Sequence, residues 1–178
     1  LFVFAISISL MLEAHIGLDP WSALHDGLSR QSGMTFGRIS QFTGLALILI
    51  SALFLRVRPG IGTLFNMATI GPWLDWLHVQ PWFPTADGGS LGLLQFLVGM
   101  LLMGFATALY IGANLGAGPR DSFILGLSQR LSKSIRLTRV VIETSVLIGG
   151  WLLGGGIGLG TVIFALGMGP IMQACLRW

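Results

Sequence analysis

"GLDPWSALHDGLS", residues 17–29, and "GAGPRDSFILGLS", residues 116–128, are two polar stretches in an otherwise apolar chain. They lie 99 positions apart, and both carry a proline near the start and end in Gly-Leu-Ser. A second motif recurs at an offset of 98, because "GIGT" at 60–63 matches "GLGT" at 158–161, and a Gly-Pro follows each copy. Two motifs in the same order and spacing predict an internal duplication.

The composition places the chain in a membrane. Hydrophobic residues make up 53% of the 178 residues and charged residues only 10%, whereas a soluble domain carries about 25% charged residues. The ten Lys and Arg residues are spread over the loops between apolar runs, which is typical of a topology signal and not of a nucleic-acid-binding surface. The sequence therefore predicts an integral membrane protein whose main partner is the lipid bilayer.

Six apolar runs approach the roughly 20 residues that a membrane helix needs. They cover residues 1–16, 36–55, 61–79, 91–112, 137–154 and 159–176. The first run is short and does not begin with methionine, so we expect part of the first helix to precede residue 1. The runs divide a single membrane domain, 1–178, into repeat 1 at 1–79 and repeat 2 at 91–178.

Each repeat holds an odd number of crossings, so the second repeat should enter the membrane from the opposite side. Six crossings leave at most two cations, Arg30 and Arg38, on one side. The other eight lie on the second side: Arg56, Arg58, Arg120, Arg130, Lys133, Arg136, Arg139 and Arg177. Because cytoplasmic loops are rich in Lys and Arg, this asymmetry supports six crossings with both termini in the cytoplasm. Inverted repeats of this kind are the usual frame of secondary transporters.

The two polar stretches each predict a short helix that begins at a proline, Pro20 or Pro119. Asp19 caps the first helix and Gly118 the second. Two interpretations stay open: the helices lie on the membrane surface, or they dip into it from opposite faces as re-entrant half-helices. If their proline ends meet, the free N–H groups and Arg120 would favour an anion.

Candidate solute-binding residues follow from the charged and polar positions within these segments. Arg139 and Glu143 are spaced i,i+4 inside an apolar run, where an unpaired charge is costly. Their spacing predicts a pair, and two interpretations stay open: a buried pair beside the solute path, or two side chains that reach out to the cytoplasmic interface. The full set of candidates is Asp19, Trp21, His25, Thr63, Asn66, Arg120, Asp121, Arg139, Glu143 and Thr161. The threonines of the two "GxGT" motifs also have a structural interpretation, as caps of helix starts.

The sequence gives little sign of catalysis. The three histidines, His15, His25 and His78, show no metal-ligand spacing, and neither a metal nor a cofactor is expected. Ser, His and Asp all occur in "WSALHDG", but adjacency in sequence does not make a catalytic triad.

The motifs resemble the YczE/YyaS/YitT-type bacterial membrane proteins, in particular the YczE-like branch. The resemblance rests on "GLDPWSALHDGLS", "RPGIGTLFN", "LGAGPRDSFILGLS", "RLTRVVIE" and "GWLLGGGIGLGTVIFALGMGP". It implies a transporter-like protein of the bacterial inner membrane and supplies neither a substrate nor catalytic residues. Asp19 stands where the family more often has glycine, so its role belongs to this sequence.

We therefore predict an all-α membrane protein with six transmembrane helices in two inverted three-helix repeats, each with a short re-entrant or interfacial helix. The predicted function is transport of a small, anionic or polar solute. Two alternatives stay open: a membrane-bound scaffold for a partner enzyme, and an enzyme acting on lipid head groups through His25, Asp26 or Glu143. A homo-oligomer also remains open.

Overall fold

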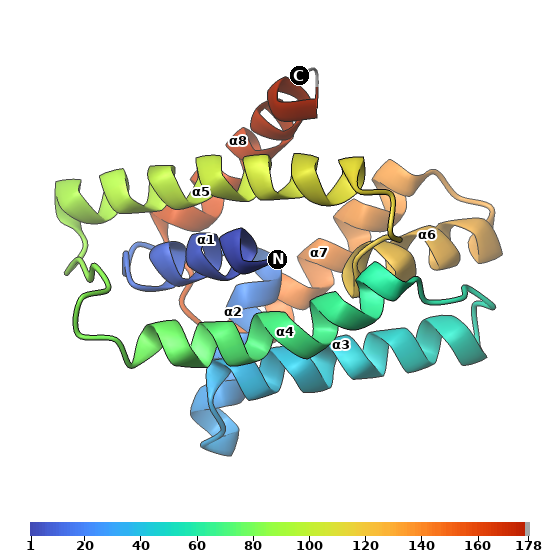
Figure 1. Ribbon diagram of the computed structural model, residues 1–178, viewed down its shortest axis with the longest axis horizontal. Helices are drawn as coiled ribbons and strands as arrows, with labels where there is room; N and C mark the ends of the chain where they lie inside the picture. Colours follow the sequence, from blue (N-terminus) through green and yellow to red (C-terminus); the bar gives the residue numbers. More distant parts are fainter. Residues whose placement is uncertain (177–178) are drawn as a thin grey trace.

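The computed structural model describes residues 1–176, which form only α-helices and the loops between them (Figure 1). This confirms the all-helical prediction. The helices are α1 (Phe2–Leu12), α2 (Pro20–Ser32), α3 (Phe36–Leu53), α4 (Ile61–His78), α5 (Gly89–Gly112), α6 (Pro119–Leu131), α7 (Ile135–Leu152) and α8 (Leu159–Leu176).

Three helices are long and apolar enough to cross a membrane, namely α3, α5 and α8. They correspond to the predicted runs 36–55, 91–112 and 159–176. The runs 61–79 and 137–154 form α4 and α7, each of 18 residues, but polar residues such as Asp75 and Arg136 make them less apolar. The run 1–16 gives a helix of only 11 residues, because α1 ends at Leu12 and the chain turns at Glu13. The structure thus has the helices of a membrane protein, three of them clear spans.

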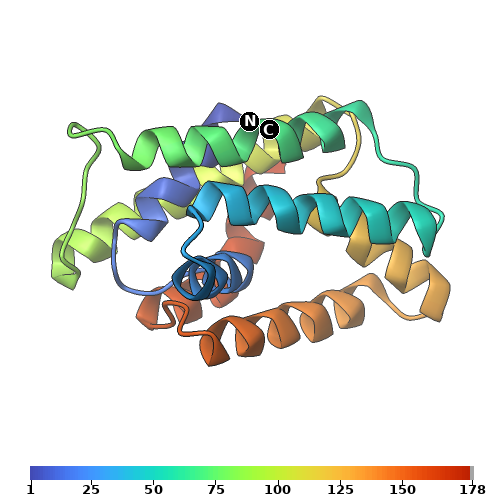
Figure 2. The ribbon, with the colours of Figure 1, turned by 90° about the horizontal axis from the view of Figure 1, so that it is seen from below.

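Two clusters of buried side chains hold the helices together. One lies among α1, α4 and α5, with Met11, Leu77 and Phe96 almost fully buried and α8 packed against its edge. The other lies among α2, α3, α6 and α7, around Trp21 and Ile124. α1 packs along α5, and α2 packs on α7 and crosses the direction of α3 (Figures 1 and 2).

The short helices begin where the sequence predicts. Pro20 and Pro119 occupy the first turn of α2 and α6, where a missing N–H costs no hydrogen bond. Asp19 caps α2 by accepting from the Ser22 N–H at 3.3 Å, and Gly118 is the N-cap of α6. Both helices have 13 residues, about 20 Å at 1.5 Å per residue. Neither is long enough to cross a bilayer.

Residues 1–79 and 91–178 share several local hydrogen bonds at the offsets of the sequence repeat. The Gly62 N–H donates to the Leu115 carbonyl at 2.8 Å, and the Gly160 N–H donates to the Ile16 carbonyl at 2.7 Å. The loop before each short helix therefore docks on the helix start of the other half. Three further hydrogen bonds recur in both halves. The Gly60 N–H donates to Thr63, as the Gly158 N–H does to Thr161. The Ser29 hydroxyl donates to the Met34 carbonyl, as Ser128 does to the Lys133 carbonyl, and the Arg38 N–H donates to Thr35, as the Leu137 N–H does to Ser134.

The halves differ in how their last two helices pack. α3 lies along α4, whereas α7 and α8 do not form a packed pair in the described chain. At the α3–α4 contact, a Cβ on Gly71 would lie 2.5 Å from both the Gly37 carbonyl and the Gln41 side chain. The equivalent of Gly37 is Arg136, and a Cβ on Gly169, the equivalent of Gly71, would meet no atom within 4 Å. The large Arg136 side chain thus replaces the glycine that permits close packing in the first half.

Candidate functional site

The N-terminal ends of α2 and α6 meet inside the molecule. Asp19 Oδ2 lies 3.7 Å from Arg120 Nη1, and the Arg120 guanidinium lies over the Trp21 ring, 5.3 Å from its centroid. The Asp19 side chain is only 5% exposed and that of Arg120 is 32% exposed. A buried carboxylate is stable only when a cation or hydrogen bonds compensate its charge, and Arg120 and the Ser22 N–H supply these partners to Asp19.

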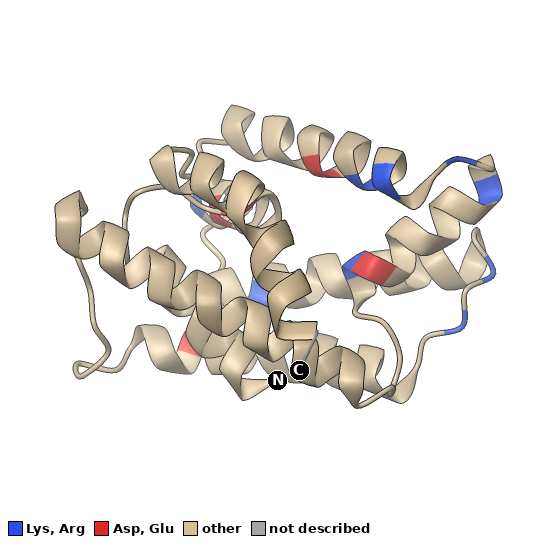
Figure 3. Ribbon diagram, turned by 90° about the horizontal axis from the view of Figure 1, so that it is seen from above, with Lys and Arg blue, Asp and Glu red and all other residues tan. Residues whose placement is uncertain are grey.

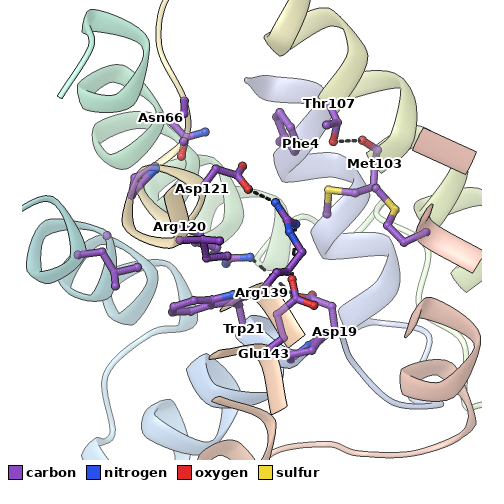
Figure 4. A pocket seen from close by; sticks show the side chains of 18 of the residues that line it. Phe4, Asp19, Trp21, Asn66, Met103, Thr107, Arg120, Asp121, Arg139 and Glu143 are labelled. Carbon is purple, nitrogen blue, oxygen red and sulfur yellow. Dashed lines mark hydrogen bonds and ion pairs between the residues drawn. The ribbon is translucent and has the colours of Figure 1, made fainter. Parts of the chain in front are cut away.

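A second arginine joins this cluster from α7. Arg139 Nη2 donates to Asp121 Oδ1 at 2.7 Å, and Arg139 Nη1 lies 3.6 Å from Glu143 Oε1 (Figure 4). The predicted pairing of Arg139 with Glu143 is therefore present. The stronger bond joins Arg139 to Asp121 on another helix.

The charges of the cluster nearly cancel. Asp19, Asp121 and Glu143 supply three negative charges, and Arg120 and Arg139 supply two positive ones. The ionised side chains therefore sum to about one negative charge. The N-termini of α2 and α6 each contribute roughly half a positive charge, which offsets this excess. The cluster offers both signs of charge without a surplus of either.

The cluster borders a cavity of about 880 Å³ that lies between the two buried clusters. This volume falls in the range of small-molecule sites, roughly 300–1,000 Å³. Figure 4 shows the charged side chains gathered together, with Phe4, Met103 and Thr107 on the side of α1 and α5. Eight of the predicted residues line the cavity: Asp19, Trp21, His25, Asn66, Arg120, Asp121, Arg139 and Glu143.

Several buried polar atoms at the cavity have no hydrogen-bond partner within residues 1–176. They are Asp19 Oδ1, both ring nitrogens of His25 and the Tyr110 hydroxyl. Burial, and to a smaller degree the charge of Arg120, lowers the pKa of His25 well below its usual value, so the imidazole is neutral at pH 7. A neutral imidazole offers one donor and one acceptor. Because buried polar groups are rarely left unpaired, these atoms are free to hydrogen-bond a group that enters the cavity.

Thr63 and Thr161 lie outside the lining of the cavity. Each is buried and accepts a hydrogen bond from the glycine three residues earlier, Gly60 or Gly158. Thr63 also donates to the Ala117 carbonyl, in the loop before α6. The geometry matches the structural interpretation of the "GxGT" motifs: these hydroxyls fix the starts of α4 and α8.

The sequence reasoning missed several residues of the cavity. Tyr110 is the chain's single tyrosine and sits in the apolar run 91–112, so it could have been singled out as a polar group inside a span. Thr144 lies one residue after Glu143 and lines the same wall. Met103, Met168 and Met172 carried no sequence signal, because a methionine in an apolar helix is ordinarily a packing residue.

Of the residues considered for catalysis, His25 and Glu143 line the cavity and Asp26 does not. Asp26 pairs with Arg30 at 3.0 Å and accepts from the Gly156 N–H at 2.9 Å, which anchors α2 to the loop before α8. Glu13 contacts His78 and, more distantly, His15 at the far end of α1. Within residues 1–176, no group of His, Cys, Asp and Glu side chains is arranged to hold a metal ion.

Fold and site together define a helical membrane protein with a charged cavity where two half-length helices meet. The chain belongs to the family of unknown function DUF6198, whose sequence profile matches residues 1–177. It is 33% identical to the uncharacterised membrane protein YczE of Bacillus subtilis over 99% of this chain and 81% of the relative. An uncharacterised protein of Haemophilus influenzae is 38% identical over 98% of this chain and 81% of its own length.

A third relative, the uncharacterised protein YyaS of Bacillus subtilis, is 26% identical over 90% of this chain and 81% of the relative. The resemblance to the YczE and YyaS proteins inferred from the motifs is therefore confirmed. No solved structure matches the chain.

Proposed function

We propose that this protein is a transporter of a small polar solute, with six spans in two inverted repeats, 1–79 and 91–178, and that the cavity is its solute site. The observation that carries the proposal is the group of five charged side chains at the cavity where α2 and α6 begin. Charged side chains inside a membrane helix bundle are costly and mark solute or ion pathways. Half-helix ends meeting near the centre of a bundle are how several transporter folds build such sites.

Two further observations support the inverted repeat. The hydrogen bonds at offsets of 98 and 99 recur in both halves, and each half's loop docks on the other half's helix start. Figure 3 also shows Lys and Arg residues of the α3–α4 loop and of the α6–α7 connection gathered at one end of the molecule. That gathering is what the positive-inside rule requires of a cytoplasmic side, and the bacterial relatives favour the bacterial cytoplasmic membrane as the location.

The charge balance changes the expected solute. Arg120 lies 3.7 Å and Arg139 2.7 Å from a carboxylate oxygen, so their positive charges are balanced and do not by themselves select an anion. Asp19 Oδ1 and the nitrogens of His25 are unpaired and can meet a cationic or hydrogen-bonding group. The proposal is therefore a polar solute, without the preference for an anion that the sequence suggested.

The alternative functions receive less support. A scaffold needs no cavity lined by charged groups. For an enzyme acting on lipid head groups, Asp26 is already paired with Arg30 and bonded to the Gly156 N–H, and Glu143 is paired with Arg139.

A thermal-shift screen tests the solute site directly. The purified protein is screened against phosphate, glutamate, glycine betaine, putrescine and neutral sugars, and we expect a polar solute to raise the unfolding temperature. Arg139→Gln should abolish that shift, while Arg136→Gln, an exposed arginine of the same helix outside the cavity, should keep it. A shift that survives Arg139→Gln contradicts the site. Failure of proteoliposomes to take up the labelled solute contradicts transport.

Cysteine labelling tests the topology. In a Cys175→Ser background, Val57→Cys in the α3–α4 loop and Asp87→Cys in the α4–α5 loop should react with impermeant reagents added to opposite sides of the membrane. These loops lie at opposite ends of the molecule (Figure 1), separated by the single helix α4. Labelling of both from the same side would rule out a crossing by α4 and with it the six-span arrangement.

A further inference from the structure

We infer that the solute is an amphiphile, with a zwitterionic head held by the Asp19–Arg120 pair and an apolar chain that enters between α7 and α8. This inference rests on the proposed function and names the class of its solute. It is carried by the shape of the cavity, by the division of its lining and by the charges at one end.

The cavity lies between the two helices that fail to pack together. Glu143, Thr144 and Leu147 of α7 line it from one side, and Met168 and Met172 of α8 line it from the other. In the first half, the equivalent helices α3 and α4 are in close contact. The second half therefore leaves an opening between two helices that face the bilayer, which is a route for a molecule dissolved in lipid.

Residues at this opening are exposed although they line the cavity. The Val140 side chain is 56% exposed, and Gly169 has no atom near its missing Cβ. Only 11% of the residues of α8 are buried within the molecule. A chain lying between α7 and α8 would cover this apolar surface.

The lining of the cavity is divided by chemistry. The charged groups lie at the start of α2 and on α6 and α7, whereas the side formed by α1, α5 and α8 carries Phe4, Ile8, Met103, Phe164 and Met168, with Thr107 and Tyr110 of α5 as its polar members. Figure 4 shows Phe4 and Met103 on that side of the charged cluster. A wholly polar solute would make no apolar contact with these side chains. Flexible methionine side chains are suited to an alkyl chain of variable position.

The head group is identified by the charges that remain available. Arg120 keeps most of its five donors free, because its contacts are the 3.7 Å pair with Asp19 and the Trp21 ring. Asp19 Oδ1 is buried and unpaired beside it. A zwitterion can place its anionic group on Arg120 and its cationic group on Asp19, which keeps both buried charges compensated.

A chain-length series tests the inference. Phosphocholine and its butyl, hexyl and octyl esters, each below its micellar concentration, are titrated into the amphipol-held protein by calorimetry, with protein-free amphipol as the blank. We expect binding to tighten about fourfold for each methylene that enters the cavity. Octyl sulfate and octyltrimethylammonium, which carry one charge each, should bind at least tenfold more weakly than octylphosphocholine. Equal binding of either single-charge amphiphile would overturn the zwitterionic head.

A matched pair of variants tests the entry route. Gly169→Leu should weaken octylphosphocholine binding at least fivefold and leave phosphocholine unchanged, because the new side chain fills the opening without a clash. Gly112→Leu, at an equally open glycine outside the cavity, should change neither. Small polar solutes that bind with no gain from an added chain would overturn this inference and leave the proposed function standing. If neither the small solutes nor the amphiphiles bind, both proposals fail.

Discussion

Replacing Gly17 by alanine should destabilise the protein by about 3 kcal/mol or more, or prevent folding. Gly17 has a φ of +118°, which an L-residue rarely adopts. A Cβ there would also lie 2.6 Å from the Gly158 nitrogen and 2.9 Å from Thr161 Oγ1. The clashing atoms include backbone at the start of α8, which cannot move without breaking the hydrogen bond from Gly160 to Ile16.

Gly33→Ala is the matched control. Gly33 also has a positive φ, +70°, but a Cβ there meets no atom within 4 Å. Its substitution measures the backbone penalty alone, about 1 kcal/mol. The free energies of unfolding of both variants are measured by tryptophan fluorescence during denaturation. Their difference contains the contact between the halves together with the larger backbone strain of alanine at φ +118°. Equal effects would show that Gly17 matters only for its backbone conformation.

Gly116, the repeat equivalent of Gly17, allows a second measurement of the docking between the halves. Its φ is +116°, and a Cβ there would lie 2.9 Å from the Gly60 Cα. We expect Gly116→Ala to destabilise the protein by a similar amount. A large effect at Gly17 and none at Gly116 would argue that the two halves no longer share this docking.

The local structure of the site could be predicted from the sequence, but the contacts between its helices could not. Proline and the preceding cap residue predict where α2 and α6 begin, because these preferences act within one helical turn. The i,i+4 spacing predicted that Arg139 would pair with Glu143. That Arg139 also reaches Asp121 on another helix depends on how α6 and α7 cross, and no spacing within one helix encodes that.

The open side of the cavity also escaped the sequence analysis. "GxGT" and Gly-Pro recur in both halves, yet α3 packs on α4 whereas α7 and α8 form no packed pair in residues 1–176. One position breaks the pattern, where Arg136 stands in place of Gly37. Its consequence is visible only once the tight contact between Gly37 and Gly71 is known. The cap and turn motifs are thus common to both halves, whereas this packing glycine is present only in the first.

Arg120→Met should reduce stability by about 2 kcal/mol, a value below the 3–5 kcal/mol seen for fully buried pairs because Arg120 is one-third exposed. The loss arises because Asp19, 4% exposed, would keep its charge with only the Ser22 N–H to compensate it. Arg130→Met, on the last turn of the same helix and exposed, is the control, with an expected change within about 0.5 kcal/mol.

The double variant Asp19→Asn with Arg120→Met separates this electrostatic effect from lost packing on Trp21. Asparagine still caps α2 but carries no charge, so the double variant should recover about half of the stability lost in Arg120→Met. A coupling energy near zero in the cycle would mean that Arg120 contributes only its contact with Trp21. Binding gives an independent measure: any solute found by thermal shift should bind at least tenfold more weakly to Arg120→Met than to Arg130→Met. Because the single and double variants differ only in the charge left at Asp19, a solute cation that needs this carboxylate should bind the single variant better than the double one.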